Sequence, residues 1–135
     1  MEETQIKEEL RLFCIKAKSF PQGITFAFRE LEQKLGGANG RSLYGLSRGD
    51  KNGIVYWAAA LSRTGEELPP GTEEIIIPPG TYLSKQLTNW RRNEAIISQT
   101  FQKMLDNPRL EPDGYCIEKY LNNDDVVCMV KIIPA

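Results

Sequence analysis

The sequence predicts an α+β fold in which a curved antiparallel sheet carries two helices on one face and a ligand cleft on the other. An order of strand, helix, strand, strand occurs twice, in pseudo-repeats of about residues 8–64 and 72–135, and two such halves can merge their strands into one sheet. The 135 residues suit a single domain, residues 1–135. Hydrophobic residues make up 41% and charged residues 26%, which is ordinary globular usage.

The first repeat begins with strand material in LRLFCIKAKS, residues 10–19, which is broken by Phe20-Pro21-Gln22-Gly23. Residues 24–35 then form a helix that ends at Gly36-Gly37, a typical C-terminal cap. The apolar residues of this helix recur at helical spacing: Ile24, Phe28, Leu31 and Leu35. Two strands, residues 41–48 and 54–61, complete the repeat as a hairpin.

The second repeat follows the turn-rich stretch RTGEELPPGT. Its first strand material covers residues 73–87, with a bend or bulge at Pro78-Pro79-Gly80. A helix is predicted over residues 91–105, ended by Asn107-Pro108. Its apolar face is formed by Ile97, Phe101 and either Met104 or Leu105. Residues 114–121 and 126–133 form the closing strand pair.

Charge and composition argue against several functions. Lys and Arg total 17 against 18 Asp and Glu, for a net charge of −1 without a basic face, so nucleic acid is not an expected partner. The N-terminus lacks a signal-peptide pattern and no apolar run reaches the roughly 18 residues of a membrane span, so we expect a cytoplasmic protein without a membrane partner. Three separated cysteines and no histidine argue against His-based catalysis and common zinc sites, and no cofactor is expected.

A single acidic residue, Glu118, interrupts the apolar run GYCIEKYL. Because strand side chains alternate, Cys116, Glu118 and Tyr120 share one face, which we expect to be open, and Ile117 faces the helices. A buried ionised carboxylate is costly unless it is paired, so Glu118 either keeps its proton through a raised pKa or pairs with an entering cation. A solvated glutamate on an exposed face is the alternative that alternation leaves open.

Aromatic residues favour the pairing with a cation, because ring faces attract positive charge. The candidate ligand-binding residues are Glu118 and Cys116 together with Tyr44, Tyr56 or its neighbour Trp57, Tyr82, Trp90 and Tyr120. Taken singly, Trp57 and Tyr82 also fit an ordinary core position. Trp90, beside Arg91-Arg92, also fits a cap of the second helix.

Three motifs of the second half occur together in one known family: Ile77-Pro78-x-Gly80-x-Tyr82, Glu118-x-Tyr120 and the final Ile133-Pro134. In their order they resemble the GyrI-like small-molecule-binding domain, which is also the effector-binding half of multidrug-sensing MerR-type and AraC-type transcription regulators. The first half matches in pattern only. The resemblance implies the duplicated α+β fold and a central acid, here Glu118, that meets lipophilic cations in the drug-sensing members. Thr88-Asn89-Trp90 stands where the family often has a glycine, which puts the width of the pocket mouth and the ligand in doubt.

We therefore predict a stand-alone module that binds a small hydrophobic molecule, a cationic one included, with Glu118 as counter-charge. No helix-turn-helix pattern precedes the first expected strand, so DNA binding by this chain unaided is not expected. A regulator protein or DNA gyrase is a further candidate partner, and monomer and homodimer stay open. The alternative is a small hydrolase in which Glu118 acts as general acid or base, assisted by Tyr120 or Tyr82, although no independent nucleophile or oxyanion motif is visible.

Overall fold

The computed structural model describes residues 1–37 and 40–135, which contain one eight-stranded antiparallel sheet and two α-helices. The strands are β1 (Glu2–Ile6), β2 (Leu10–Lys16), β3 (Leu43–Asp50), β4 (Gly53–Leu61), β5 (Glu73–Ile77), β6 (Gly80–Leu87), β7 (Cys116–Tyr120) and β8 (Val126–Lys131). The helices are α1 (Ile24–Leu35) and α2 (Ala95–Leu105), and the short 3-10 turn η1 (Trp90–Arg92) precedes α2. The predicted α+β class is confirmed.

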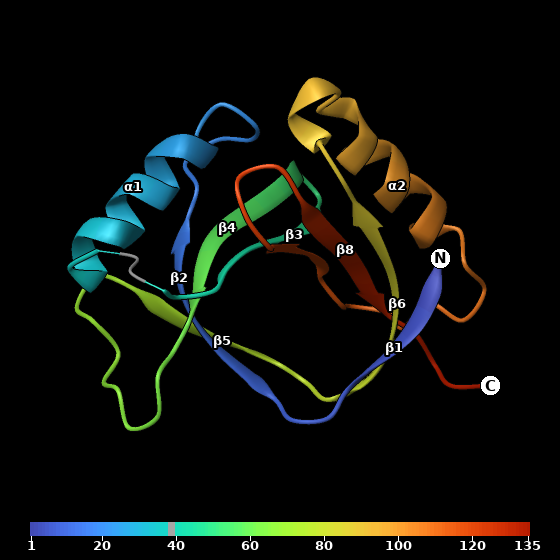
Figure 1. Cartoon of the computed structure of the whole chain (residues 1–135), viewed down its shortest axis with the longest axis horizontal. Coiled ribbons are helices and arrows are strands. Elements are labelled where there is room, and N and C mark those ends of the chain that lie inside the picture. Colours follow the sequence, from blue (N-terminus) through green and yellow to red (C-terminus); the bar gives the residue numbers. More distant parts are fainter. Residues whose placement is uncertain (38–39) are drawn as a thin grey trace.

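The strand order, β1-β6-β8-β7-β3-β4-β2-β5, explains why the sheet curls into a half-barrel. β5 and β6 stand near opposite ends of this order, yet only residues 78–79 join them along the chain. β1 and β2 are likewise near opposite ends and are joined by residues 7–9. Because each residue spans less than about 4 Å, the two ends of the sheet must bend toward each other, as Figure 1 shows.

The curl gives the sheet an inner face that forms an apolar core by itself. Ten buried residues form this inner cluster: Leu12, Cys14, Tyr44, Leu46, Trp57, Ala59, Ile77, Tyr82, Ile117 and Met129. They come from seven strands, β2 to β8, so alternate residues of each strand point inward. The inner face therefore needs no helix to cover it.

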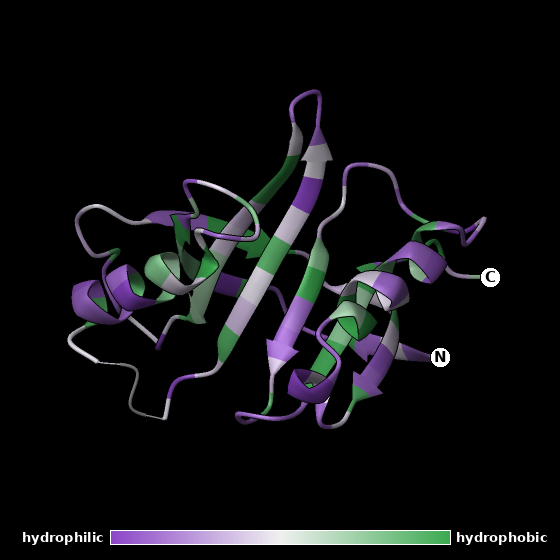
Figure 2. Ribbon diagram, turned by 90° about the horizontal axis from the view of Figure 1, so that it is seen from above, coloured by the Kyte–Doolittle hydropathy of each residue, from purple (hydrophilic) through white to green (hydrophobic). Residues whose placement is uncertain are grey.

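Both helices pack on the outer face, and they leave the central strands between them. α1 packs through Leu31 on Ile15 and Ala58, whereas α2 packs through Met104 on Val126. Figure 2, seen from above, shows the two helices on one side of the sheet and separated across it. The central strands β3 and β7 therefore lie between the two helices, and the candidate site lies on these strands.

Helix α1 has the bounds and the apolar stripe that its spacing predicts. Ala27 and Leu31 are buried, and Phe28 and Leu35 are half-buried. The helix ends because Gly36 adopts a left-handed conformation with φ 71°, which costs glycine less than any other residue.

Helix α2 begins later than the predicted range 91–105. Asn93 has φ −149° and ψ 80°, which breaks the helical path, so the residues before it form η1 and the α-helix starts at Ala95. Met104 is fully buried whereas Leu105 is 48% exposed, which decides between the two candidates for its apolar face.

The predicted hairpin and the predicted bend are both present. Asp50 pairs with Gly53, so the turn of the β3–β4 hairpin is the two residues 51–52. The strand material predicted over residues 73–87 divides at 78–79 into β5 and β6, since proline cannot donate to a strand ladder.

Strand β1 is not predicted from the sequence. It pairs with β6 at the edge of the sheet, and its residues are exposed apart from the half-buried Ile6. Polar side chains fix the pairing: Thr4 Oγ1 lies 2.7 Å from Ser84 Oγ, and Gln5 Nε2 donates to Thr81 Oγ1 at 2.9 Å.

Within the described residues, neither helix has the length and apolar character needed to cross a bilayer.

Candidate functional site

Glu118 is held in the middle of the sheet by two neighbouring strands. On β7 it lies opposite Gly45 of β3 and Cys128 of β8. Glu118 is only 8% exposed, and Cys116 and Tyr120, on the same face of β7, pack against an apolar cluster, so the acid is buried. The interpretation of Glu118 as a solvated surface residue is therefore wrong.

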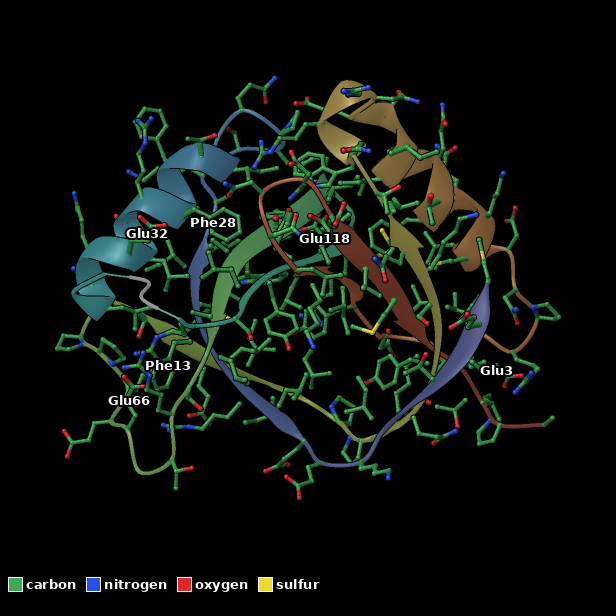
Figure 3. The ribbon with its side chains drawn as sticks, viewed as in Figure 1. Glu3, Phe13, Phe28, Glu32, Glu66 and Glu118 are labelled. Carbon is green, nitrogen blue, oxygen red and sulfur yellow. The ribbon has the colours of Figure 1, made fainter. Side chains whose placement is uncertain are left out.

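The structure places Glu118 on the face that carries the helices, not on the opposite face as expected from the sequence. Cys116 and Tyr120, on the same side of β7, pack against the cluster beneath α2, whereas Ile117 lies in the inner cluster. The physical reason is the curl: the inner face buries its own apolar residues, so the helices cover the other face. Figure 3 shows Glu118 between the two helices.

Two phenol groups are the hydrogen-bond donors to the Glu118 carboxylate. Tyr56 Oη lies 3.4 Å from Glu118 Oε1, and Tyr120 Oη donates to the same oxygen. The two phenol oxygens are 3.3 Å apart. Among the hydrogen bonds of the described residues, those to Glu118 all end on Oε1, so Oε2 keeps its capacity to accept.

Gly45 makes room for this arrangement. A Cβ atom at position 45 would lie 2.1 Å from Tyr56 Oη and 3.0 Å from Glu118 Oε1. Tyr56 is 1% exposed, so its ring has little space into which to move. Gly45 therefore supplies the space in which phenol and carboxylate meet, a contribution that sequence reasoning missed.

Five aromatic residues, here called the aromatic cluster, form a connected set of ring contacts that includes the two phenols bound to the carboxylate: Phe20, Phe28, Tyr56, Trp90 and Tyr120. The Phe20 ring stacks on the Tyr56 ring at 5.9 Å between centroids, and Phe28 meets both tyrosines edge-on. The Trp90 ring lies 6.0 Å from the Tyr120 ring. The cluster joins residues before and within α1 to a residue of η1, so it bridges the two helices over the sheet.

Burial sets the electrostatics of the site. Desolvation raises the pKa of Glu118 above 4.5, while the hydrogen bonds from Tyr120 and Tyr56 lower it in part. Burial, and then the nearby carboxylate, raise the pKa values of both tyrosines, so the phenols stay protonated as donors. Burial also raises the pKa of Cys116 to about 11 and of Cys128 to about 12, so neither thiol is a thiolate at neutral pH.

Three predicted site residues lie away from Glu118, on the inner face: Tyr44, Trp57 and Tyr82. The Tyr82 hydroxyl donates to the carbonyl oxygen of Pro78 at 2.6 Å. The Trp57 ring already contacts a cation of the protein itself, because the guanidinium of Arg48 lies 5.6 Å from its ring centroid. Of the predicted set, the structure brings together Glu118, Tyr56, Trp90, Tyr120 and the flanking Cys116.

A groove adjoins the aromatic cluster, between α1 and the turn that joins β7 to β8. Its volume is about 590 Å³, and Phe28 and Tyr120 form part of its wall. We call it the groove beside α1. Arg29 and Glu32 of α1 and Arg91 of η1 also line it. The predicted site residues do not include these charged residues or the rings of Phe20 and Phe28. In the sequence, Phe20 belongs to the segment that breaks the first strand, and Phe28 belongs to the apolar face of the first helix.

No group of three or more acidic, cysteine or histidine side chains that could hold a metal ion occurs in the described part of the chain. The hydrogen-bonding groups at Glu118 are a carboxyl and two phenols.

Neither a known protein family nor a curated protein matches the chain. Two solved structures are similar in fold. An integron cassette protein from the mobile metagenome of Vibrio cholerae matches with a TM-score of 0.68 and 14% identity, over 98% of this chain and 95% of that one. A hydrolase from Listeria innocua matches with a TM-score of 0.61 and 8% identity, over 98% of this chain and 90% of that one. At such identities the similarity shows the fold alone, and the resemblance to the GyrI-like domain stays a prediction.

Proposed function

We propose that the protein binds small hydrophobic cations between its two helices, with Glu118 as the counter-charge. The single observation that carries this proposal is a buried carboxyl group without a basic partner. None of the salt bridges within the described residues includes Glu118, and its hydrogen-bond donors are neutral phenols. Burial without an opposite charge is unfavourable for the ionised acid, and a bound cation would remove that penalty.

The aromatic cluster supports the same ligand class. Faces of tyrosine, tryptophan and phenylalanine rings attract cations by about 0.5–2 kcal/mol each as water is excluded. Phe20 is 40% exposed, whereas the other four members are buried or half-buried. Phe20 therefore has the least packing to lose, and its movement away from Tyr56 is the simplest route by which a ligand reaches the carboxylate.

Tetraphenylphosphonium and tetraphenylborate test the proposal, because they have nearly the same shape and opposite charge. In calorimetric titrations at neutral pH we expect the phosphonium to bind and the borate not to bind. Glu118→Gln should weaken phosphonium binding by about tenfold or more, which corresponds to about 1.4 kcal/mol. The matched control is Glu30→Gln, which makes the same charge change at an exposed position of α1. Equal affinity of the phosphonium for wild type and Glu118→Gln would reject the electrostatic role.

A hydrolase is the second candidate, since a carboxyl group with a raised pKa beside Tyr120 can act as a general acid or base. The fold similarity to the Listeria hydrolase agrees with this candidate but does not carry it. The nearby thiol of Cys116 is a weak nucleophile because of its raised pKa. Turnover of activated esters that is lost in Glu118→Gln would favour catalysis over binding alone.

A further inference from the structure

The groove beside α1 has the size and the lining of a ligand site. Its volume of about 590 Å³ falls within the roughly 300–1,000 Å³ of typical small-molecule pockets. Phe28, Leu43 and Tyr120 give it an apolar wall. Because Phe28 and Tyr120 also belong to the aromatic cluster, a molecule that touches these rings from the groove lies next to the Glu118 site.

The charges around this groove are mostly positive. Three guanidinium groups line it, those of Arg29, Arg41 and Arg91, against the single carboxylate of Glu32. Arg41 is neutralised, because its Nη1 and Nη2 donate to the two carboxylate oxygens of Glu66 at 2.6 and 2.8 Å. That leaves two guanidinium groups against one carboxylate, and the salt bridges of the described residues include neither Arg29 nor Arg91.

Arg91 is held in place at the edge of the groove. Its Nε donates to the carbonyl oxygen of Asn123, and its guanidinium lies 4.6 Å from the centroid of the Trp90 ring. This leaves the two terminal nitrogens of Arg91 to bind an acceptor. A guanidinium whose position is fixed in this way binds a carboxylate with less loss of side-chain entropy than a mobile one.

Two buried donors have no acceptor in the described part of the chain: Arg41 Nε, on a residue that lines the groove, and Trp90 Nε1, on the residue before Arg91. The Arg41 side chain is only 4% exposed, so water does not compensate it well. A buried donor without a partner costs about 1–3 kcal/mol. Both orphaned groups are donors, which agrees with the guanidinium excess in favouring a ligand group that accepts hydrogen bonds.

We propose that the groove beside α1 binds the carboxylate of a zwitterionic aromatic ligand whose cationic group lies at Glu118. This inference rests on the proposed function and narrows its ligand class. A simple cation bound at Glu118 is repelled by the nearby guanidinium groups of Arg29 and Arg91, whereas a molecule that also carries a carboxylate gains from them. The positive groove and the buried acid thus select a ligand with opposite charges at its two ends.

Rhodamine B and its ethyl ester test the inference, because they share one aromatic cation and differ in a free carboxylate. Fluorescence anisotropy titrations at pH 7.5 should show rhodamine B binding at least about fivefold more tightly than the ester. Arg91→Gln should remove this preference. Arg92→Gln, the same change at an exposed neighbour that does not line the groove, should keep it.

The outcomes separate this inference from the proposed function. If Glu118→Gln weakens both dyes and wild type binds them equally, the cation site stands and the carboxylate site is overturned. A preference for rhodamine B that Arg91→Gln and Arg92→Gln reduce alike would also overturn it, since net charge would then explain the effect. If Glu118→Gln weakens neither dye, the proposed function itself fails, and the zwitterion proposal fails with it.

Discussion

Replacing Glu118 by glutamine should stabilise the free protein at neutral pH, although it removes a residue from the candidate site. The pKa of Glu118 is raised above 4.5 by burial, so the folded protein holds a proton that the unfolded chain has already released. The free energy of unfolding therefore falls as pH rises from 4.5 to the folded-state pKa, and the whole loss of stability is present above that pKa. Glutamine never ionises, and its side-chain oxygen can still accept hydrogen bonds from Tyr56 and Tyr120.

The magnitude follows from proton linkage. One proton taken up on folding changes stability by at most about 1.4 kcal/mol per pH unit. Each pH unit by which the folded-state pKa exceeds 4.5 therefore adds that amount to the advantage of Glu118→Gln at high pH. For a chain of this size such an increment raises the melting temperature by roughly 3–6 °C, which is readily measured.

Thermal and urea unfolding of wild type, Glu118→Gln and the exposed control Glu30→Gln between pH 4 and 9 would provide the test. The difference between Glu118→Gln and wild type is the quantity to follow, because other carboxyl groups titrate in the same range. Glu66, for example, has its pKa lowered to about 2 by Arg41 and loses its stabilising effect as pH falls. A difference that stays constant with pH, or a Glu118→Gln variant less stable than wild type at pH 8, would refute the reasoning.

Two further changes probe the same carboxyl group. Gly45→Ala should lower the free energy of unfolding by about 1–3 kcal/mol and abolish phosphonium binding, because the new Cβ would overlap Tyr56 Oη. Gly49→Ala is the control and should change neither quantity, because the atom nearest to its Cβ would be 3.9 Å away. Retained binding in Gly45→Ala would count against the proposed packing. Tyr120→Phe should raise the pKa of Glu118 further, because it removes a hydrogen-bond donor to the ionised carboxylate. Carbon-13 NMR of the labelled carboxyl group measures this pKa. An unchanged or lower pKa would contradict the hydrogen bond from Tyr120.

Local patterns were sufficient to predict most of the architecture. The spacing of Leu31 and its neighbours predicts α1 with its observed bounds, and the turn residues at 49–53 predict the β3–β4 hairpin. Strand β1 has no such signal, because its side chains are mostly exposed and its pairing with β6 depends on contacts between distant parts of the chain. The start of α2 was placed too early because composition does not reveal the broken path at Asn93.

The site was predicted in part. Alternation correctly groups Glu118 with Cys116 and Tyr120, and burial confirms that the acid is sheltered. Alternation does not say which face the helices cover, since that depends on the curl imposed by the link at residues 78–79. For the same reason Trp57 and other aromatic residues of the inner face were grouped with Glu118, although the sheet separates them from it.

The most direct test of the account is the titration of the Glu118 carboxyl by carbon-13 NMR, with and without tetraphenylphosphonium. We predict a pKa above 4.5 in the free protein and a lower pKa when the cation is bound, since the positive charge stabilises the ionised acid. A pKa at or below 4.5 in the free protein, or one that the cation leaves unchanged, would contradict the claim that Glu118 is a buried acid in need of a counter-charge.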